Sequence, residues 1–152
     1  MSTLCYYGNP VLRKKCKEVG EITPFVRKVI SEMTEAVKIH NGAGIAAPQI
    51  GYDLRIFINV FAEETDEEGF PLALEEPEVY INPKIIKSSK KQFVNREGCL
   101  SIPGIQFDVS RPDIVDIEYT DPEGNKIIKK NQKRWRAKCL QHEMDHLNGI
   151  LF

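Results

Sequence analysis

Two histidines, His142 and His146, lie four residues apart and enclose Glu143, and these three residues are the best suited to chemistry. On a helix, side chains at this spacing project from the same face, so both imidazoles can bind one metal ion. The carboxylate between them can act on a water molecule at that ion. The HExxH pattern therefore predicts a catalytic metal site, although the same pattern also occurs by chance in charged helices.

The residues around this pattern predict the helix that carries it. Asn131 is a candidate N-terminal cap, and Gly149 is a natural stop. One face of the helix, at helical spacing, consists of Trp135, Cys139, His142 and His146. We therefore expect a C-terminal helix with both histidines on one face.

A catalytic site of this kind needs a third protein ligand and an open position for water. In proteases with the longer pattern HExxHxxGxxH, a histidine follows the glycine by three residues, but that position is Phe152 in this chain. Other proteases use a glutamate well downstream, whereas this chain ends six residues after His146. The third ligand must therefore lie upstream.

Two of the cysteines are candidates for this ligand. Cys139 precedes His142 by one turn, but a metal held between the histidines would lie about one turn further along, so we expect Cys139 to line the pocket. Cys99 stands between Gly98, which permits close backbone approach, and Leu100, whose N–H could point at the same centre. From these residues alone, a buried structural role for Cys99 stays open.

Composition places the chain among single-domain globular proteins. It has 152 residues, of which 41% are hydrophobic and 28% charged, so we expect one catalytic domain over residues 1–152. A formal net charge of −1 argues against DNA binding. The sequence contains no apolar run of membrane-spanning length and no secretory signal, so we expect a cytoplasmic protein with reduced cysteines. We also expect a monomer.

Charge is distributed unevenly along the chain. Acidic residues crowd between positions 63 and 78, and basic residues crowd between positions 126 and 138, at the approach to the predicted metal-binding helix. Such runs are usually solvated faces. A weak contact of the 126–138 segment with the ribosome is the functional alternative.

Periodic apolar residues and turn residues divide the rest of the chain into elements. An amphipathic helix is expected from a cap at Thr23 to about His40. We do not expect the His40 side chain to bind a metal ion. Strands are expected at 54–61, 79–86 with a break at Asn82 and Pro83, 105–109, 114–119 and 126–129. Strands without alternating helices indicate an α+β class with antiparallel sheets.

The segment 42–51 is rich in small residues and carries one long amide, Gln49. It follows a helix and lacks the lysine of a phosphate loop. Either two backbones pack closely there, or the glycines admit an extended ligand while Gln49 donates a hydrogen bond to a developing oxyanion. The segment by itself does not decide between these interpretations.

Three segments together resemble the signatures of peptide deformylases, the enzymes that remove formyl groups from newly made proteins. In order, they are Gly42-Ala43-Gly44-Ile45-Ala46-Ala47-Pro48-Gln49, Glu97-Gly98-Cys99-Leu100-Ser101 and Gln141-His142-Glu143-Met144-Asp145-His146. Flanking residues near 8–13, 81–83 and 147–149 extend the resemblance over the whole chain. It implies antiparallel sheets packed around a central C-terminal metal-binding helix, with an N-terminal amphipathic helix.

The resemblance also implies the catalytic groups. Glu143 would transfer the proton, while Gln49 and the N–H of Leu100 would hold the formyl oxygen. One divalent ion would be bound, ferrous iron in the family, with zinc, nickel or cobalt as substitutes. Its ligands would be Cys99, His142 and His146.

Substrates would be the N-formyl-methionyl ends of nascent polypeptides, in a bacterial or phage-host cytoplasm or an organelle stroma. We expect Lys138 to point away from the substrate pocket. The substrate contacts implied are Ala43, Gly44, Ile45, Gly98, Trp135 and Cys139.

Some residues depart from the family pattern. Ile45 stands where leucine is usual, and Gln106 where many members carry an arginine near the far end of the peptide. The chain ends at Phe152, where bacterial members usually continue into another helix, so it resembles a minimal form, such as some phages carry, or a shortened chain.

Two other functions are alternatives to a deformylase. The chain could be a metallopeptidase or other amidase, or it could be a non-catalytic metal- or peptide-binding domain. The upstream Cys99 and the intact Glu143 weigh against them.

Overall fold

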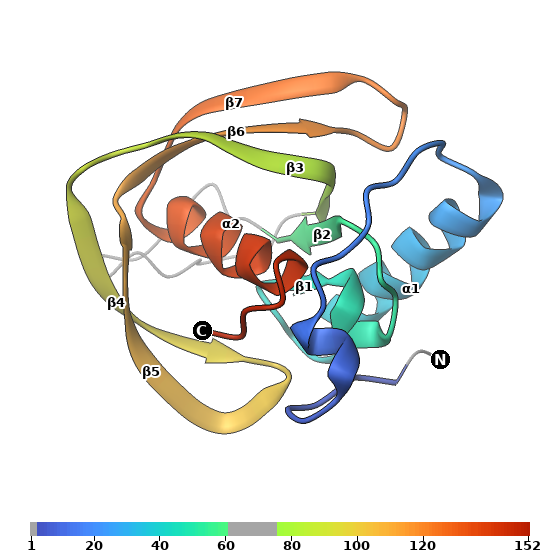
Figure 1. Ribbon diagram of the computed structural model, residues 1–152, viewed down its shortest axis with the longest axis horizontal. Helices are drawn as coiled ribbons and strands as arrows, with labels where there is room; N and C mark the ends of the chain where they lie inside the picture. The colour runs from blue at the N-terminus through green and yellow to red at the C-terminus, as the bar shows by residue number, and fades with distance from the viewer. Residues whose placement is uncertain (1–2, 61–75) are drawn as a thin grey trace.

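The helix that carries the histidines, α2 (Arg134–Leu147), lies at the centre of the computed structural model, surrounded by strands (Figure 1). The structure describes residues 3–60 and 76–152. Most of α2 is buried, and Ala137, Leu140 and His146 have no exposed surface. The predicted α+β class, with antiparallel sheets around this helix, is confirmed.

The N-terminal end of α2 differs from the expectation. Asn131 does not cap the helix, because strand β7 continues through it to Lys133. Lys133 occupies the cap position without a side-chain hydrogen bond. At the other end, Gly149 adopts a φ of 76°, and a Cβ there would lie 2.5 Å from the carbonyl oxygen of Arg13. Gly149 therefore follows the end of the helix where the sequence predicts a stop.

Five strands form an antiparallel sheet in the order β1-β2-β3-β6-β7. Their bounds are β1 Gly44–Ala46, β2 Ile56–Asn59, β3 Glu78–Ser88, β6 Ile114–Thr120 and β7 Lys126–Lys133. The predicted break in β3 is a bulge, at which the side chain of Asn82 bonds the backbone of Val19. Residues 61–75, with most of the acidic run, lie outside the described residues.

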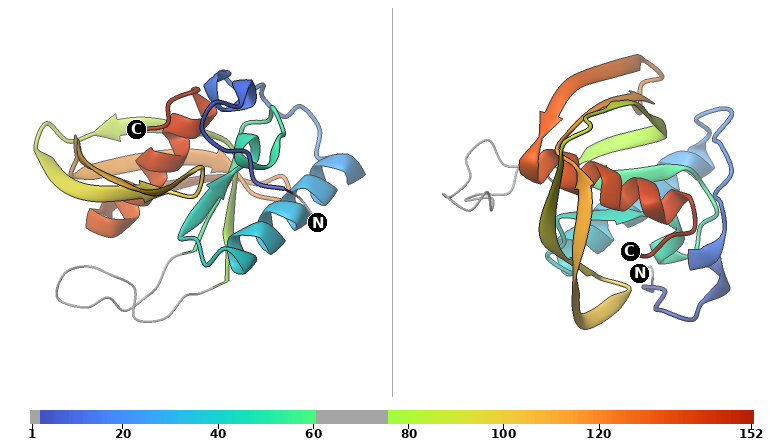
Figure 2. Two further views of the ribbon diagram at one scale, coloured as in Figure 1. Left: turned by 90° about the horizontal axis from the view of Figure 1, so that it is seen from below. Right: turned by 60° about the vertical axis from the view of Figure 1, so that its left-hand side comes forward.

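A separate hairpin of β4 (Gln92–Cys99) and β5 (Ile102–Pro112) covers another side of α2 (Figures 1 and 2). The sequence pattern predicts only the segment 105–109 of this hairpin. Strand β4 is missed because half of its residues are polar or charged, and its two large apolar residues, Phe93 and Val94, are adjacent, so no apolar alternation marks it.

The second helix, α1 (Pro24–Ile39), packs on the opposite face of the sheet from α2. Successive residues of β2 face the two helices, because Ile56 and Ile58 pack with α1, whereas Phe57 packs with α2. The predicted cap is present, since Thr23 Oγ1 accepts a hydrogen bond from the N–H of Val26 at 3.3 Å. Within the described ranges, neither helix is long and apolar enough to cross a membrane.

Candidate active site

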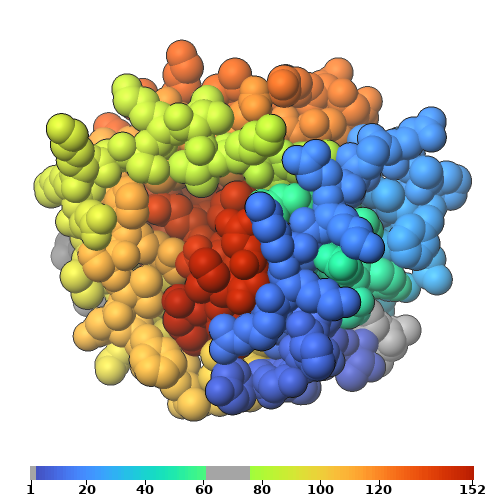
Figure 3. All heavy atoms as spheres, viewed as in Figure 1, coloured from blue at the N-terminus to red at the C-terminus, as the bar shows by residue number. Residues whose placement is uncertain are grey.

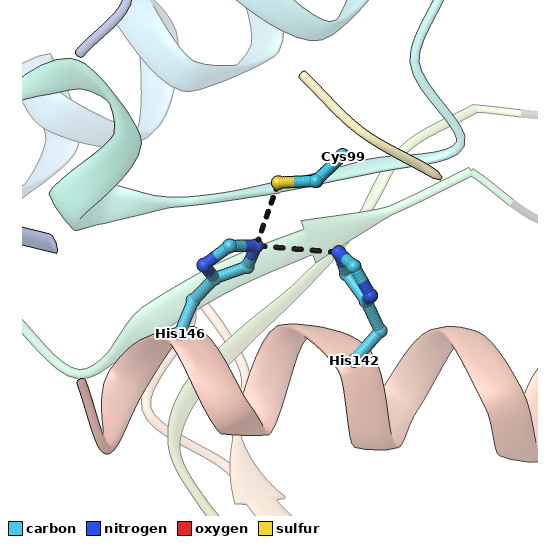
Figure 4. Close-up of side chains that lie close together, drawn as sticks. All are labelled: Cys99, His142 and His146. Atoms are coloured by element: carbon cyan, nitrogen blue, oxygen red, sulfur yellow. Dashed lines mark hydrogen bonds between the residues drawn. The ribbon is translucent and has the colours of Figure 1, made fainter. Parts of the chain in front are cut away.

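Three side chains that could hold a metal ion converge between β4 and α2. The Sγ atom of Cys99 lies 3.4 Å from Nε2 of His146, which lies 3.2 Å from Nε2 of His142 (Figure 4). All three donor atoms lie within 4.8 Å of one another. Cys99 ends β4 at the point where its pairing with β5 shifts register, and helical spacing brings both imidazoles to the same side of α2.

This donor set fits one divalent metal ion. Metal bonds of about 2.3 Å to sulfur and about 2.0–2.1 Å to imidazole nitrogen place neighbouring donors roughly 3–4 Å apart. The Cys99–His146 distance of 3.4 Å and the His146–His142 distance of 3.2 Å are of that size. Catalytic zinc-type sites use three protein ligands drawn from histidine, cysteine and carboxylate side chains and keep the fourth position for water, and this set provides three such ligands.

A buried charge network orients His142. Its Nδ1–H donates to Oε1 of Glu97 at 2.8 Å, and Arg111 binds the same carboxylate through Nε at 2.6 Å and Nη2 at 2.9 Å. Arg111 also donates to Asp145 at 2.9 Å. A histidine whose second nitrogen is held by a carboxylate presents the other nitrogen to a metal in a fixed orientation.

These partners were not predicted as site residues. Glu97 and Asp145 both lie inside recognised signature segments, next to predicted ligands, and that proximity was the available signal. Arg111 has no such signal, because it lies in β5 and reaches the site only through the folding of the hairpin.

The two buried carboxyl groups of the site differ in their affinity for protons. Burial acts to raise the pKa of Glu97, but the hydrogen bonds from His142 and Arg111 outweigh it and lower that pKa to about 2. Burial raises the pKa of Glu143 to about 7. Glu97 is therefore a fixed anion, whereas Glu143 can exchange a proton near neutral pH.

Gln49 is held rigidly beside Cys99. It lies in the short 3₁₀ helix η2 (Ala47–Ile50) and is 2% exposed. Its Oε1 accepts a hydrogen bond from the N–H of Ala46 at 2.9 Å, and its Nε2 donates to Oγ of Ser101 at 3.2 Å. The Nε2 group also donates to the Cys99 sulfur at 3.6 Å, so the amide points its donor toward the candidate metal site.

A cavity of about 760 Å³ opens beside this centre. Its lining combines segments from β1, η2, the β4–β5 hairpin and α2. Predicted site residues in the lining are Ala43, Gly44, Gln49, Gly98, Cys99, Leu100, Trp135, Cys139, His142 and Glu143.

Two side chains lie elsewhere than the sequence suggests. Ile45 does not line the cavity, because alternation along β1 turns its side chain into the core, where it is fully buried. Lys138 does line the cavity, and the expectation that it points away was wrong. The β4–β5 hairpin covers that side of α2, so Lys138 donates to the carbonyl of Arg96 at 3.4 Å, with its Nζ 4.5 Å from the centroid of the Trp135 ring.

Phe152 lies against the site rather than away from it. Its ring centroid lies 5.9 Å from that of His142 and 4.9 Å from that of Phe107 in β5. In Figure 3 the C-terminal residues, in red, fill the face between the hairpin and the N-terminal segment. The end of the chain therefore packs beside His142 on this face.

The family model for polypeptide deformylase matches residues 1–152, the whole chain. The chain belongs to this family. A deformylase of Borreliella burgdorferi is 39% identical over 149 residues, which cover 98% of this chain and 84% of that relative. The family resemblance read from the three signature segments is thereby confirmed.

Solved deformylase structures share the fold. A probable peptide deformylase from Synechococcus phage S-SSM7 superposes with a TM-score of 0.87 at 31% identity, covering 100% of this chain and 97% of the phage chain. The Met-Ala-Ser-bound deformylase of Acinetobacter baumannii gives a TM-score of 0.88 at 28% identity, covering 99% of this chain and 95% of that one. Like other deformylases, the chain is thus an enzyme of a metal-dependent family.

Proposed function

We propose that this protein removes the N-formyl group from formyl-methionyl peptides at the Cys99, His142 and His146 centre, within a single catalytic domain of residues 1–152. Family membership gives the reaction. The observation that carries the site assignment is the convergence of a thiol and two imidazoles next to the buried Glu143, beside a cavity. Hydrolysis replaces the formyl C–N bond with a C–O bond and yields formate and a free amine.

A divalent ion would be held by Cys99, His142 and His146. When bound, it supplies Lewis acidity, which polarises a carbonyl and makes water a stronger acid. We infer ferrous iron as the resident ion from the resemblance to the family, with zinc, nickel or cobalt as substitutes. Imidazole ligands suit iron, zinc and nickel alike, so the ligand set does not choose among them. Metal analysis of anaerobically purified protein tests this inference.

Glu143 would move the proton. It takes a proton from the attacking water and passes it to the nitrogen of the leaving amine, as a general base and then a general acid. Its burial beside the metal ligands supports this role, since a carboxyl with a pKa of about 7 can both accept and release a proton.

Gln49 and the backbone N–H of Leu100 would stabilise the formyl oxygen. The Gln49 amide is fixed by Ala46, so its donor is preorganised toward the centre. Leu100 follows Cys99 in the turn between β4 and β5 and lines the same cavity.

The peptide would bind as an added strand between two sheet edges. Strand β1 is the terminal strand of the five-stranded sheet, and β4 pairs only with β5 among the described strands. Both therefore offer unpaired backbone groups, near Gly44 and Gly98, to an extended ligand. Ala43 and Ile45 would contribute through the backbone of the β1 segment, and Trp135 and Cys139 would contact the first side chain.

The protein would act as a monomer in the cytoplasm of a bacterium or phage host, or in an organelle stroma, where formylated chains are made. Weak ribosome contact would involve the exposed part of the 126–138 segment, such as Lys130 and Lys133. Lys129 and Lys138 are not available for it, because Lys129 pairs with Glu78 and Lys138 lines the cavity.

Formate release from formyl-Met-Ala-Ser by anaerobically prepared, iron-loaded protein tests the activity. We expect rapid release that a chelator abolishes. We expect acetyl-Met-Ala-Ser to react far more slowly, because the acetyl methyl group needs space in a site lined closely by Gly44, Gln49 and Leu100. Equal rates for the two peptides, or cleavage of internal peptide bonds seen by mass spectrometry, would overturn the proposal.

A further inference from the structure

Asn59, the last residue of β2, is a polar residue at a fully buried position. Its side chain has no exposed surface, and neither its Oδ1 nor its Nδ2 has a hydrogen-bond partner within residues 3–60 and 76–152. Burying an amide without partners costs stability, whereas an apolar side chain of similar size would not. A polar side chain at this position therefore points to a role other than packing.

Asn59 and Glu143 meet over Gly44. Gly44 is the register partner of Asn59 in the β1–β2 pair. A Cβ atom on Gly44 would collide with Oδ1 of Asn59 and would lie 2.8 Å from Oε1 of Glu143. The missing side chain of Gly44 thus leaves the space that both polar groups border. The other carboxylate oxygen of Glu143, Oε2, is also buried without a partner in the described chain.

An amide can hydrogen-bond a carboxyl group in either direction. An asparagine side chain has one acceptor and two donors, and rotation about its last torsion exchanges them. Neither polar atom of Asn59 has a partner in the described residues, and the carboxyl group of Glu143 borders the same space over Gly44. Asn59 is therefore placed to orient Glu143, which an apolar side chain at this position cannot do.

We propose that Asn59 is a positioning residue for Glu143, whose carboxyl group it orients across the space left by Gly44. This inference rests on the proposed function of Glu143. Asn59 is neither one of the three candidate metal ligands nor one of the residues that line the cavity, so its effect passes through Glu143.

The test uses Asn59→Leu in the full-length, iron-loaded enzyme. We expect kcat for formyl-Met-Ala-Ser to fall by on the order of 10–100-fold, a part of the about 10²–10⁴-fold that a well-placed general base contributes. Metal content and KM stay unchanged, and the melting temperature stays equal or rises, because a buried polar group without partners has been removed. Asn59→Ser, whose hydroxyl both donates and accepts, should recover part of the lost kcat. Asn59→Ala serves as a smaller replacement where leucine prevents folding.

A double-mutant cycle with Glu143→Gln separates positioning from a structural effect. Once Glu143 is replaced, changing Asn59 should alter the residual rate by less than about twofold, because the two residues act as one unit. A further loss of the same factor in the Glu143→Gln background would overturn the proposal, as would a kcat of Asn59→Leu within about twofold of wild type. An inactive wild-type enzyme would instead contradict the proposed function itself.

Discussion

At the scale of single residues, the candidate site assigns different tasks to chemically similar groups. Glu97 and Glu143 are both buried carboxyl groups close to His142, yet Glu97 is paired with Arg111, whereas Oε2 of Glu143 has no hydrogen-bond partner within residues 3–60 and 76–152. Cys99 and Cys139 are both thiols near the site, yet only Cys99 shares the space of the imidazoles. Replacing individual members of these pairs tests whether their roles differ.

Glu143→Gln should keep the metal and lose most of the activity. The three ligands are untouched, and a glutamine fills the same space, but it cannot accept and return a proton. Loss of general acid–base catalysis typically costs about 10²–10⁴-fold in rate. Metal analysis of the variant checks that the metal is retained, and formate release by the same preparation checks that activity is lost. Chelator-sensitive activity within a few-fold of wild type would contradict the role of Glu143.

Cys99→Ser should bind metal more weakly, whereas Cys139→Ser should bind it as the wild type does. A serine hydroxyl is a far poorer ligand than a thiolate at neutral pH. Burial raises the pKa of the Cys139 thiol strongly, which keeps it protonated and unsuited to bind a metal. Competition with a chelator measures both affinities. Stoichiometric, tightly held metal in Cys99→Ser would place the third ligand elsewhere.

At the scale of elements, the β4–β5 hairpin contributes both a ligand and its support. Cys99 ends β4, while Arg111 near the end of β5 connects Glu97 of β4 to Asp145 of α2. The hairpin is thereby tied to the helix by charge-assisted hydrogen bonds in a buried setting. Its registration against α2 depends on those bonds.

Arg111→Met should weaken both folding and metal binding. Glu97 would lose its buried cation, and breaking a buried pair from one side typically costs about 3–5 kcal/mol. The orientation of His142 would suffer as well, which typically costs about 10–100-fold in metal affinity. Urea unfolding of the metal-free protein and metal titration measure the two effects.

Arg96→Met is the matched control on the neighbouring strand. Arg96 pairs with Asp108 at 3.9 Å, but the two side chains are 69% and 72% exposed. Substitution of such a surface pair typically changes stability by less than about 0.5 kcal/mol. If Arg96→Met and Arg111→Met destabilise the protein equally, the buried network does not hold the hairpin to α2.

At the scale of the whole molecule, the candidate metal site lies where the hairpin meets the central helix. A metal bound by Cys99 of β4 together with His142 and His146 of α2 would link the two elements directly. Such a link forms in the folded protein and not in the unfolded chain, so metal binding and folding are coupled.

Removal of the metal should therefore lower the melting temperature. A ligand present at about 100 times its dissociation constant stabilises the native state by about 2.7 kcal/mol. Calorimetry with and without chelator measures the shift. In Cys99→Ser, chelation should lower the melting temperature much less than in wild type. In His40→Ala, which changes a residue at the exposed end of α1, chelation should lower it as much as in wild type. An unchanged shift in Cys99→Ser would contradict a metal link between β4 and α2.

The sequence by itself determined the features that depend on neighbours along the chain. Helical spacing predicted that His142 and His146 share a face, and the cap at Thr23 and the stop at Gly149 predicted where helices begin and end. The signature segments, read in order, gave the family, which the matching family model confirmed. These features were legible because each is encoded within a few residues.

Only the tertiary structure decided what depends on contacts between distant segments. It brought Cys99 to the histidines, joined Arg111 to Glu97 and Asp145, and turned Lys138 into the cavity by placing a hairpin over α2. A polar strand such as β4 has no periodic signal, and a buried ion pair leaves no trace in local spacing. Local rules describe one element at a time, whereas a site built from three elements depends on how those elements pack.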